Sequence, residues 1–508
     1  MKRFGIVSFF FLAIFAVVAQ TNLPPAELMD TNANARWMSL QDCIDEALVH
    51  NLDIQIQREN PQISLYKLDG AYSGYDLTWN MSGQHNYNFT PPSFILTTNL
   101  ETVPANVQES DSFNSDVGGT LPWGLQYDFI GQIEQNKQNT IGEPVTENTP
   151  GSIQVTLTQP LLKNFWIDST RLGIRQAKNN VQYSEQGLRY QVINSVTAVA
   201  NAYYELIYAF ENVQVQDEAL DLSQTQLDQD QQRVDIGSLA PLSVQQDQSQ
   251  VAQNQANLIQ AQLTLTSDQN ALKTLVADTN YAMWHDTDIK PTEPLEAKME
   301  EFDLQDSWNK GMTERPDLIQ ARLTAENQGI QLKFDRNQLF PELDAFGSYG
   351  YNGSGAQYSD SFGEINQGNA PFYSYGAKIS MPLGNIGPRN ALKSDKLTLQ
   401  QYLLTLKQDE QNVMVGIDNA VQTAKSDYQS VDATRQARIY AEAALDAEQK
   451  TYAVGKATTF EVLTYQNNLT TARLAEIRAL ANYEEALANL SQQEGSTLER
   501  YGIFMDIP

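Results

Sequence analysis

The stretch Arg233-Val-Asp-Ile-Gly-Ser-Leu-Ala-Pro-Leu-Ser-Val-Gln-Gln246 decides the fold, because its pattern returns at Thr451-Tyr-Ala-Val-Gly-Lys-Ala-Thr-Thr-Phe-Glu-Val-Leu-Thr464. With Gly237 placed on Gly455, the two stretches align at a constant offset of 218 residues. Each copy interrupts a long helical pattern with a glycine and small or hydroxylated residues. Glycine supplies the left-handed conformation that ends a helix, and Pro241 suits the first turn of the next one. Both stretches are therefore predicted to be tips of antiparallel helical hairpins.

Long helices are predicted to lead into both tips. From Arg171 to Asp235 and from Arg389 to Val454 the chain contains no proline. Apolar or small residues recur there in alternating steps of four and three, which makes a seam for side-by-side packing as in a coiled coil. The seam residues are Val192, Val196, Val199, Tyr203, Leu206, Phe210 and Val213, then Met414, Ile417, Val421, Ala424, Tyr428 and Val431. A helix of about 65 residues is roughly 98 Å long, so the molecule is expected to be elongated.

Between the helical regions lie segments in which apolar and polar residues alternate, the pattern of strands with one apolar and one polar face. Residues 77–89 and 153–157 show it in the first half, and residues 373–381 in the second. Their length and aromatic ends suit strands that cross an outer membrane, which need about 9 to 11 residues. A soluble sandwich would show the same alternation. The long flanking helices favour membrane-crossing strands over a soluble sandwich.

Each half of the mature chain thus has the same order of short helices, strands and a hairpin. In chain order, the predicted segments are short helices at 37–70, strands at 71–162, a hairpin at 163–276 with its tip at 237–241, an equatorial linker at 277–303, short helices at 304–340, strands at 341–384, a hairpin at 385–490 with its tip at 455–459, and an equatorial tail at 491–508.

The N-terminus and the charge indicate an exported protein. Met1-Lys-Arg precedes an apolar run, and small residues before Gln20 mark a cleavage site, so residues 1–19 are predicted to be a signal peptide and 20–36 a flexible lead. The single cysteine, Cys43, has no partner for an intrachain disulfide and is expected to be buried in a helix. A net charge of −29 argues against nucleic acid as a partner.

No catalytic or metal-binding pattern is present in the sequence. His50, His85 and His285 are far apart and show no ligand spacing. Gly353-Ser-Gly355 is interpreted as an exposed loop rather than a phosphate cradle, because no helix is expected directly after it. We therefore expect no enzyme activity and no cofactor.

The repeated order of elements resembles the TolC-like outer-membrane efflux and secretion channels. The most specific marks are Gln159-Pro-Leu-Leu162 before Arg171, Met381-Pro-Leu383 before Arg389, and the two glycine tips. The resemblance implies a mixed α and β membrane protein, a homotrimer whose strands close one transmembrane β-barrel. That barrel is continued by a long α-helical periplasmic barrel, built from two structural repeats per chain. It also implies a location in the outer membrane, reaching into the periplasm, with a periplasmic adaptor protein and an inner-membrane transporter as partners.

One departure from the family concerns the strands of the first half. Two further alternating segments, within 112–135, are joined at Leu121-Pro-Trp-Gly124. They predict an extra hairpin, either in the barrel wall, giving about 18 rather than 12 strands in a trimer, or folded outside or inside it.

The resemblance places candidate gate residues at the tips. Glu461 takes the position of a family aperture acid, and Tyr452 that of a tyrosine that bonds across to the neighbouring hairpin, with Ser243 as its acceptor. Thr464 stands where the family has a second acid, and Ala457 where it has an arginine. The expected adaptor contacts at the tips are Gly237, Ser238, Leu239, Gly455, Lys456 and Ala457.

Acidic side chains also crowd the last turns before the first tip, with only Arg233 nearby to oppose them. They are Asp217, Glu218, Asp221, Asp228, Asp230 and Asp235. Such a run either lines the narrow end of a tunnel or forms a solvated helix face. A solvated acid at a helix tip is likewise the alternative interpretation of Glu461.

The function predicted from these features is a passive exit channel of a tripartite efflux pump or a type I secretion system. The alternative is a structural or adhesive cell-surface spacer without a pore. Membrane fractionation separates the two, because a channel is extracted from outer membranes with detergent and conducts ions.

Overall fold

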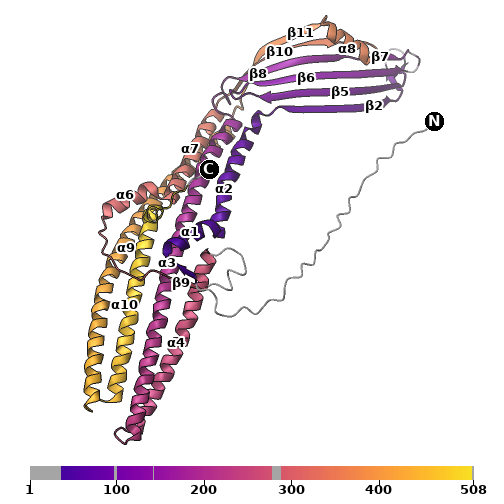
Figure 1. Ribbon diagram of the computed structural model, residues 1–508. Helices are drawn as coiled ribbons and strands as arrows, with labels where there is room; N and C mark the ends of the chain where they lie inside the picture. The colour runs from indigo at the N-terminus through magenta and orange to yellow at the C-terminus, as the bar shows by residue number, and fades with distance from the viewer. Residues whose placement is uncertain (1–35, 97–99, 141, 143, 277–287, 506–508) are drawn as a thin grey trace, which may run out of the picture.

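The computed structural model of the 508-residue chain describes residues 36–96, 100–140, 142, 144–276 and 288–505. The predicted signal peptide, nearly all of the lead and residues 277–287 of the linker lie outside these residues. The molecule is elongated, with a sheet at one end and two helical hairpins at the other (Figure 1).

The long strands form one antiparallel sheet whose path runs β11-β10-β8-β6-β5-β2. Its members are β2 (Thr78–Thr90), β5 (Asn106–Thr120), β6 (Gln126–Thr140), β8 (Gly151–Pro160), β10 (Glu342–Gly353) and β11 (Pro371–Ser380). The repeats meet where β10 pairs with β8, with Tyr349 opposite Val155. Short strands lie off this path: β3 (Ser93–Leu96) pairs with β4 (Leu100–Val103), and β7 (Thr146–Asn148) pairs with β6.

Residues 112–135 belong to the sheet itself. Strands β5 and β6 pair over their full length, from Asn106 opposite Thr140 to Thr120 opposite Gln126. The turn between them is closed by a bond from the Gly124 amide to the Leu121 carbonyl, with Gly124 at φ +92°. The pair lies between β2 and β8 in the strand path. The first half therefore supplies four strands to this path, and the second half two.

Two local elements differ from the sequence prediction. Helix α8 (Tyr358–Gln367) begins three residues after Gly355, so the expectation of no following helix is wrong. Its N-terminus is fixed by a capping box between Gln357 and Asp360, and its C-terminus by Gly368 at φ +67°. The lead ends in strand β1 (Arg36–Met38), which pairs in parallel with β9 (Ile289–Pro291), a pairing that spans about half the chain.

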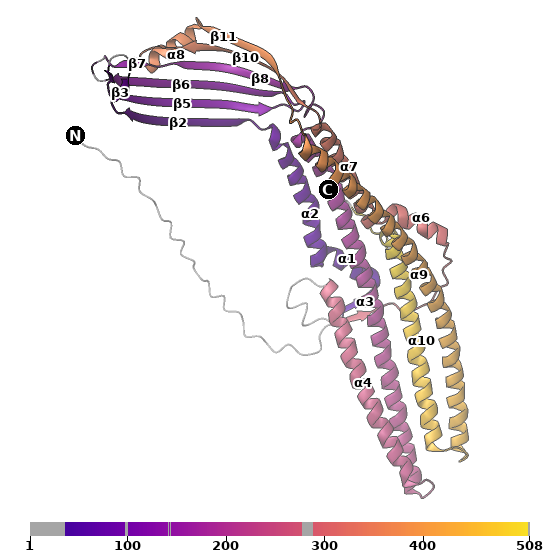
Figure 2. The same ribbon diagram turned by 180° about the vertical axis from the view of Figure 1, so that it is seen from behind.

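The helical hairpins are α3 (Ser169–Asp235) with α4 (Pro241–Val276), and α9 (Ile386–Ala453) with α10 (Thr459–Glu494). They lie side by side, and α4 and α10 are about half as long as their partners (Figures 1 and 2). The shorter helices α1 (Leu40–His50) and α2 (Leu52–Ala71) continue the first pair towards the sheet. Helices α6 (Leu304–Glu314) and α7 (Pro316–Gln338) pack against α9, and α11 (Thr497–Arg500) follows α10. Of the helices described, none combines the length and the hydropathy needed to cross a membrane.

The core lies at the middle of the rod, where α1, α4 and α10 surround α3. Val196, Val199, Tyr203 and Leu206 are fully buried there, and the Tyr203 hydroxyl donates to the Met38 carbonyl at 3.0 Å. Cys43 is buried in α1, as predicted. The predicted seam is correct for most of its members, but Met414 is 37% exposed and its neighbour Val413 is buried instead. Phe210 and Val213 are only partly buried.

Candidate functional site at the hairpin tips

Both hairpins turn with the same backbone geometry. Gly237 and Gly455 have φ of +74° and +73°, and a Cβ atom added at either would meet nothing within 4 Å. The amide of the residue after each glycine bonds back to a helix carbonyl, Ser238 to Arg233 at 2.8 Å and Lys456 to Thr451 at 3.1 Å. This is the Schellman pattern of helix ends. Glycine is needed here for its left-handed backbone, not for close packing.

The tips lie at the end of the molecule farthest from the sheet (Figure 2). The predicted adaptor contacts Gly237, Ser238, Gly455 and Lys456 are exposed, and the remaining two, Leu239 and Ala457, are partly exposed. The tips therefore present accessible ends of two loops at one pole of the rod.

Glu461 serves as part of a helix cap in the single chain. Its carboxylate accepts from the Thr458 amide at 2.8 Å and from the Thr458 hydroxyl at 2.9 Å, while the Glu461 amide donates to that hydroxyl at 3.3 Å. The amide and hydroxyl of Thr458 lower the pKa of Glu461, because they stabilise its charged form. Thr464, one turn further along the helix, is exposed and donates to the Phe460 carbonyl at 2.8 Å.

Tyr452 joins the two hairpins, but not through Ser243. Its hydroxyl donates to the carboxylate of Asp230 on α3, at 2.6 Å from each oxygen, and lies 3.0 Å from the hydroxyl of Thr459. The predicted acceptor is therefore wrong: a buried carboxylate is a stronger acceptor than a serine hydroxyl. Ser243 instead lies in the first turn of α4, where its amide bonds to the Ala240 carbonyl at 3.1 Å.

Further contacts surround Asp230. The Thr459 hydroxyl donates to the Asp230 carboxylate at 3.1 Å, and the side-chain amide of Gln226 donates to it at 3.0 Å. The Arg233 guanidinium lies 3.7 Å from its carboxylate and 4.6 Å from the centre of the Tyr452 ring. Asp230 is fully buried, whereas Asp228 two residues earlier is exposed. The acidic run before the first tip is thus not uniformly a solvated face.

Asp247 on α4 is a second buried carboxyl group beside Asp230, and the sequence analysis missed it. It is fully buried, and within the described part of the chain neither of its oxygens has a hydrogen-bond donor. Burial, together with the neighbouring carboxyl of Asp230, raises the pKa of Asp247 to about 7. Seam spacing was the available signal: Gln226 and Asp230 follow Leu220 and Ser223, and Asp247 follows Val244, at steps of three and four.

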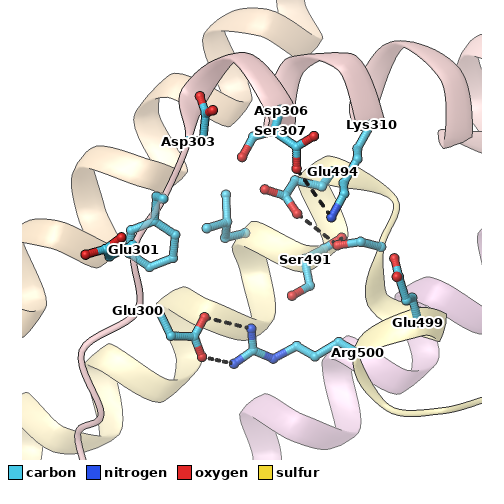
Figure 3. A pocket seen from close by; sticks show the side chains of 13 residues that line it. Glu300, Glu301, Asp303, Asp306, Ser307, Lys310, Ser491, Glu494, Glu499 and Arg500 are labelled. Atoms are coloured by element: carbon cyan, nitrogen blue, oxygen red, sulfur yellow. Dashed lines mark hydrogen bonds and ion pairs between the residues drawn. The ribbon is translucent and has the colours of Figure 1, made fainter.

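A separate acidic hollow lies away from the tips, between α6, the end of α10 and α11 (Figure 3). Its acidic residues are Glu300, Glu301, Asp303, Asp306, Glu494 and Glu499. Arg500 donates to both oxygens of Glu300, at 3.0 and 3.3 Å, and Lys310 lies 3.6 Å from Asp306. Both cations therefore already have partners in the hollow. The pair of Arg500 and Glu300 ties the tail to the linker, whereas the pair of Lys310 and Asp306 lies within α6.

Comparison with known proteins places the chain among outer-membrane channels. The sequence model of the outer membrane efflux protein family matches residues 134–278 and 310–496. The outer membrane protein TolC of Vibrio cholerae is 23% identical over 357 residues, which cover 65% of this chain and 75% of that protein. TolC of Escherichia coli is 25% identical over 329 residues, covering 60% and 62%. The crystal structure of the Campylobacter jejuni CmeC outer membrane channel has a TM-score of 0.65, at 13% identity, and covers 93% of this chain and 91% of that one.

Proposed function

The chain belongs to the outer membrane efflux protein family, and we propose that three copies of it form the passive exit channel of a tripartite efflux pump or a type I secretion system. Membership makes the protein an outer-membrane exit channel that extends into the periplasm, so the resemblance found in the sequence is confirmed. The family is one of transport proteins, and the alternative of a surface spacer without a pore is set aside.

The proposal of a trimer is supported by the open edges of the sheet. Its two outer strands, β2 and β11, each have one edge without a partner among the described strands, and apolar side chains such as Trp79, Tyr87 and Tyr375 are exposed on it. In lipid, each unpaired backbone group costs several kcal/mol. If β2 of one copy pairs with β11 of the next, both edges are satisfied. Three copies then close a barrel of about 18 strands, with β5 and β6 in its wall.

The helical hairpins support a tunnel below that barrel. Each copy contributes two hairpins with the same turn geometry, so a trimer has six tips around its axis. We assign Glu461, Thr464 and Ser243 to the aperture formed by these tips, and Tyr452 to the contact that holds the two hairpins of one copy together. Three symmetry-related copies of Glu461 around a narrow opening repel one another and attract cations.

The partners we propose are a periplasmic adaptor protein and an inner-membrane transporter. The exposed loop residues Gly237, Ser238 and Leu239 of the first tip, with Gly455, Lys456 and Ala457 of the second, are assigned to the adaptor. Transport energy is supplied by the inner-membrane transporter, since the channel itself is passive.

The test is purification of the full chain from outer membranes in detergent, followed by native mass spectrometry and recording in planar bilayers. We expect a trimer that conducts ions. We also expect Glu461→Ala to change single-channel conductance or block by divalent cations, whereas Asp45→Ala, which removes an exposed acid on α1, leaves both unchanged. A stable monomer that needs no detergent contradicts the channel, and unchanged behaviour of Glu461→Ala removes it from the aperture.

A further inference from the structure

We propose that Asp230 and Asp247 share one proton. This proton stabilises the tip of the first hairpin and its contact with the second hairpin, so that the tips open more readily as the surrounding pH rises. The stabilisation itself rests on contacts within one chain. Its consequence for an aperture rests on the proposed function.

The two carboxyl groups stand on facing helices of one hairpin. Asp230 is five residues before the end of α3, and Asp247 is in the second turn of α4. Both are fully buried, the carboxyl of Asp230 neighbours that of Asp247, and in the described part of the chain neither oxygen of Asp247 has a hydrogen-bond donor. Two ionised carboxylates have no hydrogen to place between them and repel each other in a medium of low dielectric. A single proton converts this repulsion into a short hydrogen bond between α3 and α4.

The surrounding groups decide which carboxyl carries the proton. Asp230 already accepts hydrogen bonds from the Tyr452 and Thr459 hydroxyls and from the side-chain amide of Gln226, and the Arg233 guanidinium lies 3.7 Å away. In the described part of the chain Asp247 accepts no hydrogen bond, which favours the protonated form. Asp247 is therefore the donor and Asp230 the acceptor of the shared bond.

Among the described residues, few charged and titratable groups face the pair. Arg233 faces it from α3 and stacks on the Tyr452 ring. Tyr452 faces it from α9, and burial beside Asp230 raises the pKa of this tyrosine, so its hydroxyl keeps its proton throughout the range considered. From α10 the pair meets the uncharged Thr459. On α4, Asp247 is itself the titrating group.

A bound metal ion fits this place less well than a proton. Within the described residues, no group of three or more His, Cys, Asp or Glu side chains is arranged to hold a metal. Metal ions such as Ca²⁺ take six or more oxygen ligands, whereas among the described residues the one carboxyl group beside Asp247 is that of Asp230. A proton needs nothing beyond the two carboxyl groups.

The direction of the pH response follows from proton linkage. The closed tip holds the proton up to the raised pKa of Asp247, about 7, whereas an opened tip releases it near the ordinary value for aspartate, about 3.9. Between these values only the closed tip binds the proton, so each rise in pH favours opening. The stabilisation is complete below about pH 4 and is lost as the pH rises through about 7.

The test is amide hydrogen exchange of the full chain in detergent, followed by mass spectrometry of peptides covering residues 220–250, with labelling times corrected for the chemical exchange rate. From about pH 5.5 to about pH 8.5, protection at the first tip is expected to fall by up to about thirtyfold, the ratio set by the Asp247 pKa of about 7 and the starting pH of about 5.5. A flat profile for the unmodified chain overturns the proposal.

Matched variants locate the effect. Asp247→Asn replaces the protonated acid with an amide that donates to Asp230 at every pH, so its protection should be high and independent of pH. Asp228→Asn removes an exposed acid from the same helix and should keep the pH response. The same slope in Asp247→Asn as in the unmodified chain overturns the proposal. So does protection that follows the sodium concentration at fixed pH but not the pH, because the pair would then bind a cation.

Exchange and conductance separate this proposal from the proposed function. A trimer that conducts but shows no pH-dependent exchange at residues 220–250 rejects only the shared proton. A protein with that exchange response but no conductance rejects only the channel assembly. If both hold, open probability in bilayers should rise with pH on the side of the tips, and this rise should be absent in Asp247→Asn.

Discussion

The two hairpin tips share one turn and are held closed in different ways. Under the offset of 218 residues, the capping pair Thr458 and Glu461 of the second tip corresponds to Ala240 and Ser243 in the first, which cannot form the same box. Conversely, the buried Asp247 corresponds to Tyr465. The second tip is closed by hydrogen bonds between residues three apart, the first by a buried carboxyl pair contributed by two helices. A repeated turn therefore conserves the backbone, while the side chains that stabilise it differ.

The largest effect is expected from Tyr452→Phe, because this hydroxyl links the two tips. Its removal leaves the buried Asp230 without its closest donor. A hydrogen bond to a charged group contributes about 1.5 to 3 kcal/mol, and we expect the free energy of local opening to fall by about 2 kcal/mol at both tips. Hydrogen exchange of peptides around residues 230 and 452 measures this. Tyr465→Phe is the control, since its hydroxyl makes no hydrogen bond in the described part of the chain; loss at one tip alone would show that Tyr452 does not couple them.

Alanine at either turn glycine tests whether the backbones are equivalent. Gly237→Ala and Gly455→Ala both place a Cβ atom in open space at nearly the same positive φ. The strain of a left-handed residue, about 1 to 2 kcal/mol, should therefore be the same at both tips. Thermal and exchange measurements on the two variants are expected to agree. A much larger loss at one glycine would mean that its loop has a further role in the assembled protein, such as packing against a neighbouring copy.

The capping box provides a change that can be made in both directions. Thr458→Ala should weaken the second tip by about 1 kcal/mol and leave the first unchanged. The double substitution Ala240→Thr with Ser243→Glu places the same box before α4 and should strengthen the first tip by a similar amount. Exchange protection of peptides at each tip measures both. Equal effects of Thr458→Ala at the two tips would contradict the view that this box acts locally.

The sequence predicted the features that depend on neighbouring residues. The glycines at 237 and 455, the proline-free helices and the alternating strands are local patterns, and the structure has turns, helices and strands at those positions. The two extra strands of the first half followed from alternation around Leu121-Pro-Trp-Gly124. These elements follow from backbone propensity and hydrophobic periodicity, which need no knowledge of distant contacts.

The features that the sequence did not predict depend on contacts between residues far apart in the chain, or on residues that are buried against the usual preference of their type for solvent. The β1 and β9 pairing joins residues 36 and 289 through three-residue strands too short to show alternation. Asp230 bonds to Tyr452, 222 residues away, and was grouped with exposed acids because aspartate is seldom buried. Asp247 was missed for the same reason, although its position in the seam was visible. Helix α8 lies inside a predicted strand region, and its first turn carries only a weak signal: Asp360, whose carboxylate accepts from the Gln357 amide, stands three residues after a residue that is not a preferred N-cap.

The smallest effect, and the one that most directly separates the tips, is the pH response of Glu461. Its cap lowers the pKa of this exposed carboxyl, so the second tip is stabilised above the ordinary glutamate pKa of about 4.3 and loses that stabilisation as the pH falls further. The first tip behaves oppositely, since the raised pKa of Asp247 makes it weaker as the pH rises towards about 7. Hydrogen exchange of peptides covering 455–470, between about pH 5 and about pH 3, should show protection falling in acid. Glu461→Gln keeps a capping side chain but cannot titrate, so its profile should be flat, while Asp446→Asn keeps the acid response. If both tips weaken in the same direction of pH, the two are not closed by different chemistry and the distinction between them fails.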